Sequence, residues 1–167
     1  LPTDTDGRPA IDSVNAALSQ WVEPLFDLLG FGRLPAGPGD GIVNDDKSKT
    51  FKISHLWQHV PIHVVAWHTE LDKRPDGAGT VPPQSYVQEM LNRTSAHLWA
   101  VVTNGRQVRL LRDSSALATA AYVEFDLEAI FDGELFSDFV LLYRLLHASR
   151  FEVEPEELPA ECWLEKW

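Results

Sequence analysis

The stretch from His97 to Arg112, HLWAVVTNGRQVRLLR, decides how the rest of the chain is interpreted. Two β-prone runs flank Asn104-Gly105. Asn-Gly is the strongest short-range signal for a two-residue hairpin, because both turn positions require a positive φ and these two residues tolerate it. The stretch therefore predicts a hairpin with strands at about 98–103 and 106–112.

The residues before this hairpin predict a buried strand and a helix. Val60–His68 is almost continuously apolar, which is typical of a central strand buried on both faces. Residues 84–94 carry apolar side chains at helical spacing and predict a helix. Two short β-prone pieces, at 41–43 and 50–54, enclose a polar tip and complete this part of the fold.

Two further helical regions are expected, one at each side of this central part. Apolar residues from Val14 to Leu29 recur at helical spacing, after Asp12 or Ser13 as the capping residue. Pro24 is expected to kink this helix or to begin a second short one, and Gly30 to end it.

After the hairpin, Tyr122–Phe125 predicts a short strand and Asp126 the cap of the next segment. Residues 134–148 carry the apolar stripe of a helix. The whole order predicts an α/β (α+β) fold, in which helices flank a small mixed sheet that contains the Asn-Gly hairpin.

The length of 167 residues fits one domain. We expect an irregular arm over 1–10, the domain over 11–150, and an acidic, proline-containing linker over 151–167 that leads to a larger downstream chain. No apolar run is long enough to span a bilayer, and the N-terminus lacks the form of a signal peptide. A cytoplasmic location without a membrane partner is therefore the default expectation.

The charge balance is strongly acidic, with 25 acidic and 14 basic residues and a net charge of −11. Such a chain lacks the broad basic face that non-specific phosphate binding needs, which argues against autonomous DNA binding. Its one basic concentration supplies the candidates for contacts to a phosphate backbone. Arginines on an exposed hairpin are equally expected as protection of an edge strand against pairing, and both interpretations stay open. The basic residues are Lys73, Arg74, Arg93, Arg106, Arg109 and Arg112.

Four histidines, His55, His59, His63 and His68, are close in sequence and suggest a metal site. On a strand, however, residues four apart share a face but lie about 13 Å apart, too far to ligate one ion. No cysteine and no nearby carboxylate pair completes a zinc set, so we expect no metal here. The single cysteine, Cys162, excludes an internal disulfide and is expected to be structural.

An acidic group near the predicted central strand suggests a magnesium-dependent nuclease. Such sites place carboxylates on adjacent strands, with a lysine two positions after the second carboxylate. Here Trp67-His68-Thr69 stands at the end of the strand, and on a regular strand Glu70 and Lys73 would face opposite ways. A solvated acidic loop is the favoured interpretation. The candidate residues are Asp45, Asp46, Glu70, Asp72 and Lys73.

Several runs resemble the N-terminal region of large bacterial restriction–modification proteins, the adenine-specific DNA methyltransferases of phage-defence systems. These relatives are akin to type II enzymes that join nuclease and methylase in one chain. The resemblance covers nearly everything from Val14 to Trp167. The runs that carry it are Ser54–His63, Gln88–Arg93, Leu98–Arg106, Arg109–Asp113, Tyr122–Glu128 and Cys162–Trp167.

The resemblance implies a PD-(D/E)xK nuclease-like fold, in which Pro24–Gly30 matches the first helix and Gln88 lies on the helix before the hairpin. Where the nucleases carry Glu-x-Lys, this chain has Trp67-His68-Thr69. The resemblance therefore implies a non-catalytic module that needs no cofactor of its own. It also implies S-adenosylmethionine in the parent enzyme, and as partners a downstream methyltransferase domain, DNA or other defence proteins.

Two alternatives stay open. One is an active magnesium-dependent endonuclease that uses the acidic group named above, with Lys73 and Gln88. The other is a protein-interaction domain without DNA contact, which suits the net charge of −11. Trp163 and Trp167, beside Cys162 and Leu164, are expected to form an apolar patch for the rest of a larger chain.

Overall fold

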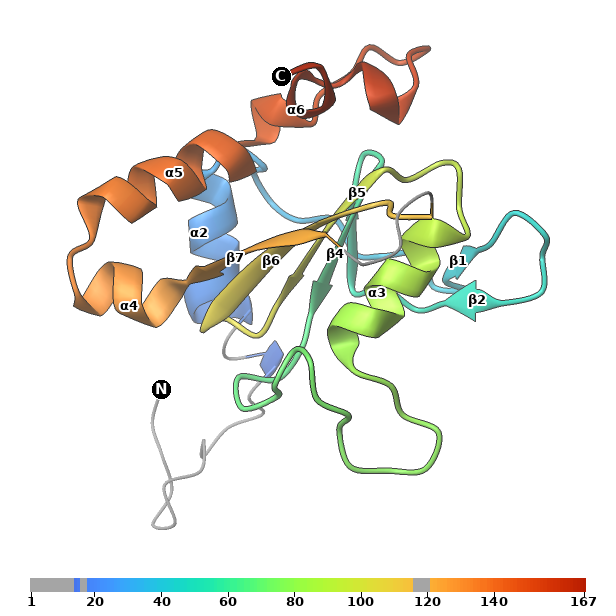
Figure 1. Cartoon of the computed structure of the whole chain (residues 1–167), viewed down its shortest axis with the longest axis horizontal. Helices are drawn as coiled ribbons and strands as arrows, with labels where there is room; N and C mark the ends of the chain where they lie inside the picture. Colours follow the sequence, from blue (N-terminus) through green and yellow to red (C-terminus); the bar gives the residue numbers. More distant parts are fainter. Residues whose placement is uncertain (1–13, 16–17, 116–120) are drawn as a thin grey trace.

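The computed structural model describes residues 14–15, 18–115 and 121–167. Its centre is a mixed five-stranded sheet (Figure 1), in which β4 and β5 are parallel and the other neighbours antiparallel. A parallel pair requires a crossover connection, and helix α3 (Pro83–Asn92) supplies it between β4 and β5. The predicted α+β fold with a mixed sheet is thus confirmed. The strand order is β3 (His55–Trp57), β4 (Val60–Val64), β5 (Trp99–Thr103), β6 (Gln107–Arg112) and β7 (Tyr122–Asp126).

The hairpin lies where it was predicted, with β5 and β6 paired from Trp99–Arg112 to Thr103–Val108. Its turn, however, has a positive φ only at Gly105 (85°), because the described non-glycine residues with positive φ are Lys47, Gln58 and Glu134. The Asn104 side chain instead accepts hydrogen bonds from the backbone N–H of Arg106 (2.9 Å) and Gln107 (2.8 Å). The expectation of two positive φ angles was wrong because an asparagine side chain can imitate a backbone turn.

Strand β4 is shorter than the predicted 60–68 and ends at Val64. Its partner β5 ends at Thr103, where the hairpin turn begins, and the Val65 N–H makes the last bond to that strand. The residues after Val65 therefore have no strand to pair with. They form a turn, closed by a bond from the Thr69 N–H to the Ala66 carbonyl (2.9 Å) and held by the Asn104 side chain on the Thr69 carbonyl (2.8 Å). Trp67-His68-Thr69 therefore does not lie on the central strand.

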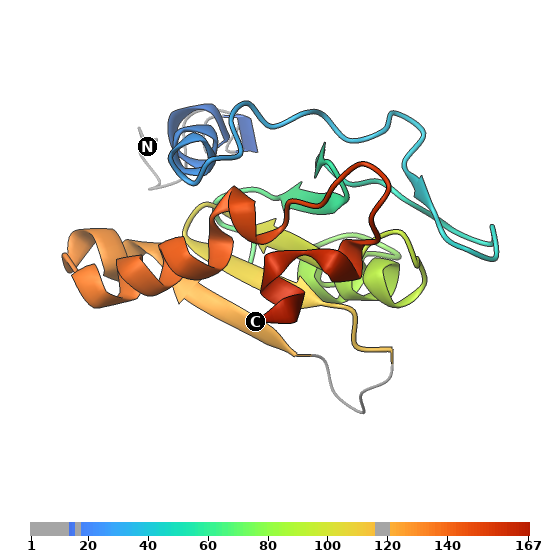
Figure 2. The ribbon, with the colours of Figure 1, turned by 90° about the horizontal axis from the view of Figure 1, so that it is seen from above.

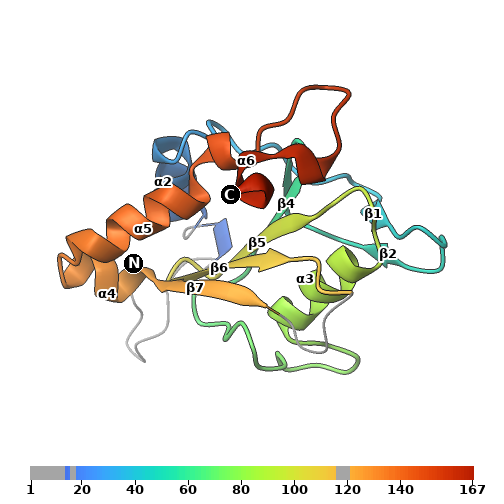
Figure 3. The same ribbon diagram turned by 45° about the horizontal axis from the view of Figure 1, so that its top comes forward.

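Helices lie on both faces of the sheet (Figure 3), and each face has its own apolar core. Helix α3 and the small hairpin of β1 (Ile42–Val43) and β2 (Thr50–Phe51) cover one face, where Val87, Met90 and Phe51 are fully buried. The helices α2 (Glu23–Leu28), α5 (Phe136–Leu146) and α6 (Trp163–Lys166) lie on the other face. The two β-prone pieces and the 84–94 helix are thereby confirmed.

The predicted first helix is divided at Pro24. A π-helical turn, η1 (Leu18–Val22), precedes α2, which has the proline in its first turn and is followed by Gly30 at φ +85°. A proline fits there because the first-turn N–H has no helical partner to lose. The capping residues expected at 12 and 13, and the arm at 1–10, lie outside the described residues.

The helices after β7 also agree with the sequence. Asp126 caps α4 (Leu127–Asp132) by accepting a hydrogen bond from the Ala129 N–H (2.9 Å), and α5 follows within the predicted range. In the described part of the chain, no helix is long and apolar enough to cross a membrane.

The last segment contacts the domain instead of leaving it at once. After the 3-10 turn η2 (Ala148–Arg150), the chain runs through η3 (Pro159–Glu161) into α6, close to α5 (Figure 2). Cys162 is fully buried, and this burial raises the pKa of its thiol. A downstream chain after residue 167 stays a prediction, but Leu164 packs against the core and Glu165 binds Arg112 of β6.

Candidate functional site

Two polar clusters flank α3, one at each end. The helix has ten residues and is therefore about 15 Å long. Its first turn lies beside β6, since Gln84 contacts Arg109, and its last turn lies beside the β1–β2 loop, since Arg93 contacts Asp46. These two clusters contain half of the candidate residues, namely Asp45, Asp46, Asp72, Arg93 and Arg109.

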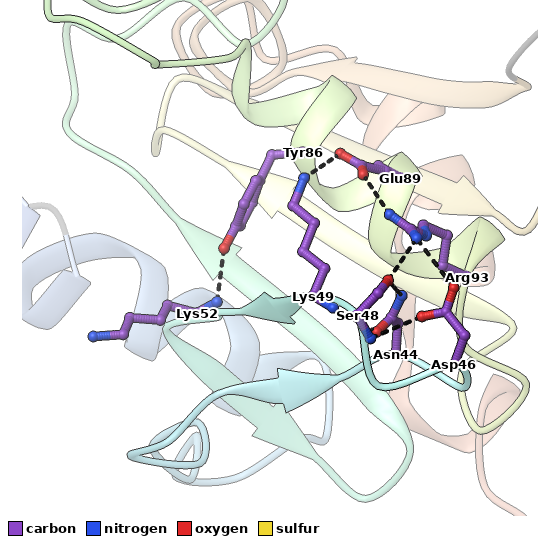
Figure 4. Close-up of polar contacts among 8 residues, drawn as sticks. All are labelled: Asn44, Asp46, Ser48, Lys49, Lys52, Tyr86, Glu89 and Arg93. Atoms are coloured by element: carbon purple, nitrogen blue, oxygen red, sulfur yellow. Dashed lines mark hydrogen bonds and ion pairs between the residues drawn. The ribbon is translucent and has the colours of Figure 1, made fainter.

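The cluster at the end of α3 joins the helix to the β1–β2 loop (Figure 4). Arg93 donates to Asp46 (3.3 Å), to Ser48 Oγ (2.9 Å) and to Glu89 (3.2 Å). Lys49 pairs with the other oxygen of Glu89 (2.7 Å). Each of these four charged side chains therefore has an opposite charge beside it.

The hydrogen bonds in this cluster stabilise the charged forms of its carboxylates. The Lys49 ammonium, followed by Arg93, lowers the pKa of Glu89. Bonds from Ser48, followed by the Arg93 charge, lower the pKa of Asp46. Asp45 accepts from the Ser95 N–H (3.0 Å) and so fastens the loop to the end of the helix. The cluster therefore connects the β1–β2 loop to the C-terminal end of α3.

The cluster at the start of α3 surrounds Arg109, which is only 4% exposed. Its guanidinium donates to Glu124 on β7 and to the Gln84 side chain. Asp72 lies 3.6 Å from it, and the ring of Tyr122 lies 4.9 Å from the guanidinium carbon. A guanidinium has five N–H donors and loses much of its hydration when it is buried. The partners of Arg109 replace the water that burial removes.

The acids proposed for magnesium are not brought together. Asp45 and Asp46 lie at the end of α3 and Asp72 at its start, while Glu70 pairs with Lys73 (2.7 Å) in an exposed turn. Within residues 14–15, 18–115 and 121–167, no three His, Cys, Asp or Glu side chains are placed to hold a metal ion.

Gln88, implied by the resemblance, is buried in the middle of α3. Its amide donates to the Arg112 carbonyl (2.9 Å) and to Asn92 Oδ1 (2.9 Å). The bond to Arg112 connects the helix to β6, and the bond to Asn92 lies within α3. The side chain is therefore oriented towards the sheet and away from any of the candidate acids.

The four candidate DNA-binding arginines do not share a surface. Arg109 and Arg112 are three residues apart on β6 and thus face opposite sides of the sheet. Arg106 pairs with Glu128 (3.0 Å), and Arg112 forms two bonds to Glu165 (3.0 and 2.5 Å). With Arg93 and Arg109 paired as described above, all four are neutralised by carboxylates. A role in DNA binding stays a prediction.

The histidines also have separate partners. His59 Nε2 donates to the Phe151 carbonyl (2.7 Å), and His97 Nδ1 donates to the His59 carbonyl (2.8 Å). His55 Nδ1 lies 3.0 Å from Ser54 Oγ. His63 lies against the Tyr86 ring on the α3 face, where burial lowers its pKa to about 4. These contacts are structural.

Gln84, Glu124 and Glu165 are not among the candidate residues predicted from the sequence, although each binds a candidate arginine. Glu124 had a usable signal, because the β6–β7 register places it directly opposite Arg109. Glu165 had none, because its partner lies 53 residues away in sequence and no local pattern connects the two.

The helices α4 and α5 carry an apolar surface that is partly exposed. Phe136 is 76% exposed, and Phe131 and Leu135 are about two-fifths exposed. A hollow of about 410 Å³ between the two helices has Glu134 as its one charged lining residue. We call this region the α4–α5 surface. Contiguous exposed apolar area of this kind is typical of a protein interface.

No family model, no curated protein and no solved structure matches this chain. The chemistry of the candidate site therefore has to be inferred from its own geometry. That geometry offers paired charges at both ends of α3 and an unpaired apolar surface on α4 and α5.

Proposed function

We propose that the chain is a non-catalytic, PD-(D/E)xK nuclease-like module of a restriction–modification adenine-specific DNA methyltransferase, and that it acts by docking onto the methyltransferase domain. The observation that carries the proposal is the separation of the candidate acids by the length of α3. Two-metal and one-metal hydrolysis both need carboxylates that reach the same ion, at about 2 Å each, so acids about 15 Å apart cannot cooperate.

The pairing of the arginines supports docking to protein over binding of duplex DNA. A phosphate would have to displace Glu128 to reach Arg106, or Glu165 to reach Arg112. The surrounding charge is also unfavourable, because the whole chain carries −11.

The α4–α5 surface supports a protein partner directly. Aromatic and aliphatic side chains such as Phe136 and Leu135 contribute most of the energy of protein interfaces when they enter a partner's pocket. In the described part of the chain, no other element buries these side chains. A methyltransferase domain in the same polypeptide, or encoded beside it, would cover them.

Plasmid nicking tests the non-catalytic part of the proposal. Supercoiled plasmid is incubated with the chain and magnesium or manganese, next to a variant that combines Glu70→Ala and Asp72→Ala. We expect the two proteins to leave the plasmid equally intact. Nicking by the natural chain that the variant loses would contradict the proposal.

Association with the adenine methyltransferase encoded with this chain tests the docking part. Phe136→Asp and Leu135→Asp should each weaken the association at least about tenfold, because a charge would be buried in the interface. Val43→Asp serves as the matched control, since Val43 is 51% exposed on β1, away from the α4–α5 surface. The proposal fails if all three variants behave alike, or if no such methyltransferase accompanies the chain.

A further inference from the structure

A second hollow, of about 190 Å³, lies where α5, η2 and α6 meet. It is lined by two arginines, Arg144 and Arg150, and by two tryptophans, Trp163 and Trp167. We call it the Arg–Trp pocket. It shares no residue with the clusters at α3 or with the α4–α5 surface.

The two arginines of the pocket differ from the four candidate arginines, because neither has a carboxylate partner within the described residues. Arg150 Nε donates to the Arg144 carbonyl (2.8 Å), which fixes the orientation of its guanidinium and leaves the two terminal nitrogens available. A planar guanidinium with free terminal nitrogens is well shaped for a phosphate or a carboxylate.

The two indoles are exposed but their segment is held in place. Trp163 is 67% and Trp167 77% exposed. Between them, Leu164 packs against the core and Glu165 is fastened to Arg112. The pocket therefore presents aromatic faces from a fixed support, which lowers the entropy lost when a flat ring stacks on them.

The neighbouring charges restrict what this pocket can accept. An adjoining hollow is lined by Glu152, Glu154, Glu157 and Glu161, of which Glu161 is neutralised by Lys166 (2.9 Å). The remaining glutamates would repel a long run of phosphates. A ligand with one or two negative groups beside a flat ring fits better.

We propose that the Arg–Trp pocket binds one unpaired nucleotide, with an indole stacked on the base and the guanidinium groups on its phosphate. A peptide carboxylate would satisfy the arginines but leave the indoles unused, and bases inside a duplex do not expose their faces for stacking. The same chemistry is offered by a free nucleotide and by one in a single strand. The inference does not depend on the proposed function, because it concerns other residues.

Titration of tryptophan fluorescence tests the proposal, with adenosine monophosphate and a short single-stranded oligonucleotide as probes. The natural chain is compared with Arg144→Ala/Arg150→Ala and with Trp163→Ala. Arg33→Ala/Arg74→Ala is the matched control, since these two arginines are exposed, have no ion pair and give the same change in charge. Circular dichroism verifies that each variant is folded.

We expect both pocket variants to lose about tenfold or more in affinity and the control to stay within about twofold. Equal affinity for both probes would identify the free nucleotide as the ligand, and a preference for the oligonucleotide would identify the strand. For the strand, one or two phosphate contacts predict a salt slope of about −0.7 per phosphate. Absence of binding to both probes, or an equal loss in the control, would overturn the proposal.

Discussion

Arg109 and Arg112 lie three residues apart on the same strand, yet they differ in burial and in the elements that they contact. Arg109 is 4% exposed on the α3 face and contacts β7, α3 and the loop at Asp72. Arg112 has a side chain that is 39% exposed on the other face, and it binds Glu165 and the ring of Trp99. Strand alternation alone sends the two guanidinium groups to opposite sides of the sheet.

The comparison teaches that burial, and not residue type, decides what an arginine contributes here. A buried guanidinium has lost its hydration and depends on each of its partners. A half-exposed one keeps water as an alternative, so its ion pair adds little. Substitution of a buried arginine should therefore cost more stability than substitution of an exposed one.

Arg109→Ala should cause the largest loss of stability. It removes the guanidinium from a buried cluster, leaves the Glu124 carboxylate without its cation, and frees Gln84 at the start of α3. We expect the free energy of unfolding to fall by about 3 kcal/mol. Urea denaturation at neutral pH measures it as a lower midpoint with an unchanged slope.

The double variant Arg109→Ala/Glu124→Ala is the control for this prediction. Removing both charges should restore part of the loss, because the single variant leaves one charge unpaired. If Arg109→Ala lowers the free energy of unfolding by less than about 1 kcal/mol, Arg109 contributes no more than an exposed ion pair does. That result would contradict the effect of burial.

His63 tests whether the α3 face resists charge in general. Burial lowers its pKa to about 4 in the folded chain, against about 6.5 for an unfolded one. As the pH falls from about 6.5 to about 4, the unfolded chain binds a proton that the folded chain does not. Stability should therefore fall over this range, by roughly 2–3 kcal/mol in total.

Unfolding curves at several pH values check this prediction, with His63→Gln as the comparison. Burial also lowers the pKa of His55 and His97, so the variant should keep a smaller slope in the same pH range. The carboxylates Glu89 and Asp46 have lowered pKa values, and their contribution is lost at more acidic pH. Equal slopes in the natural chain and the variant would show that His63 is not held neutral.

Removing the ion pair between Arg112 and Glu165 should have a moderate effect. Arg112→Ala and Glu165→Ala are each expected to cost about 1 kcal/mol, and the double variant little more than either one. Both single variants should also release α6, seen as faster proteolysis near Trp163. A double variant whose loss equals the sum of the single losses would mean that the two residues act independently.

Most of the fold follows from local patterns in the sequence. The β5–β6 hairpin, α3, β7 with its cap at Asp126, and α5 depend on turn chemistry and on periodicity within about ten residues. The end of β4 does not, because it depends on where β5 loses its pairing, at Thr103. The run Val60–Trp67 stays largely apolar past Val64, so its composition does not indicate where pairing with β5 ends.

The candidate site was harder to predict for a related physical reason. The sequence grouped Arg106, Arg109 and Arg112 by closeness along the chain, but Arg106 lies in the turn before β6, and the strand places Arg109 and Arg112 on opposite faces. It grouped Asp45, Asp46 and Asp72 by charge, but α3 separates them. Only the partners from distant segments, Glu124 and Glu165, reveal what each arginine does.

Arg106→Ala should have the smallest effect of the set. Arg106 and Glu128 are exposed to 43% and 46%, so water replaces each of them readily when the other is removed. We expect a change in the free energy of unfolding within about 0.5 kcal/mol, and a smaller one at high salt because the pair is screened. Urea denaturation at low and high salt measures both. Because Arg106 and Arg109 are neighbours in sequence and both pair with a glutamate, a loss for Arg106→Ala as large as for Arg109→Ala would mean that pairing, and not burial, sets the contribution of these arginines.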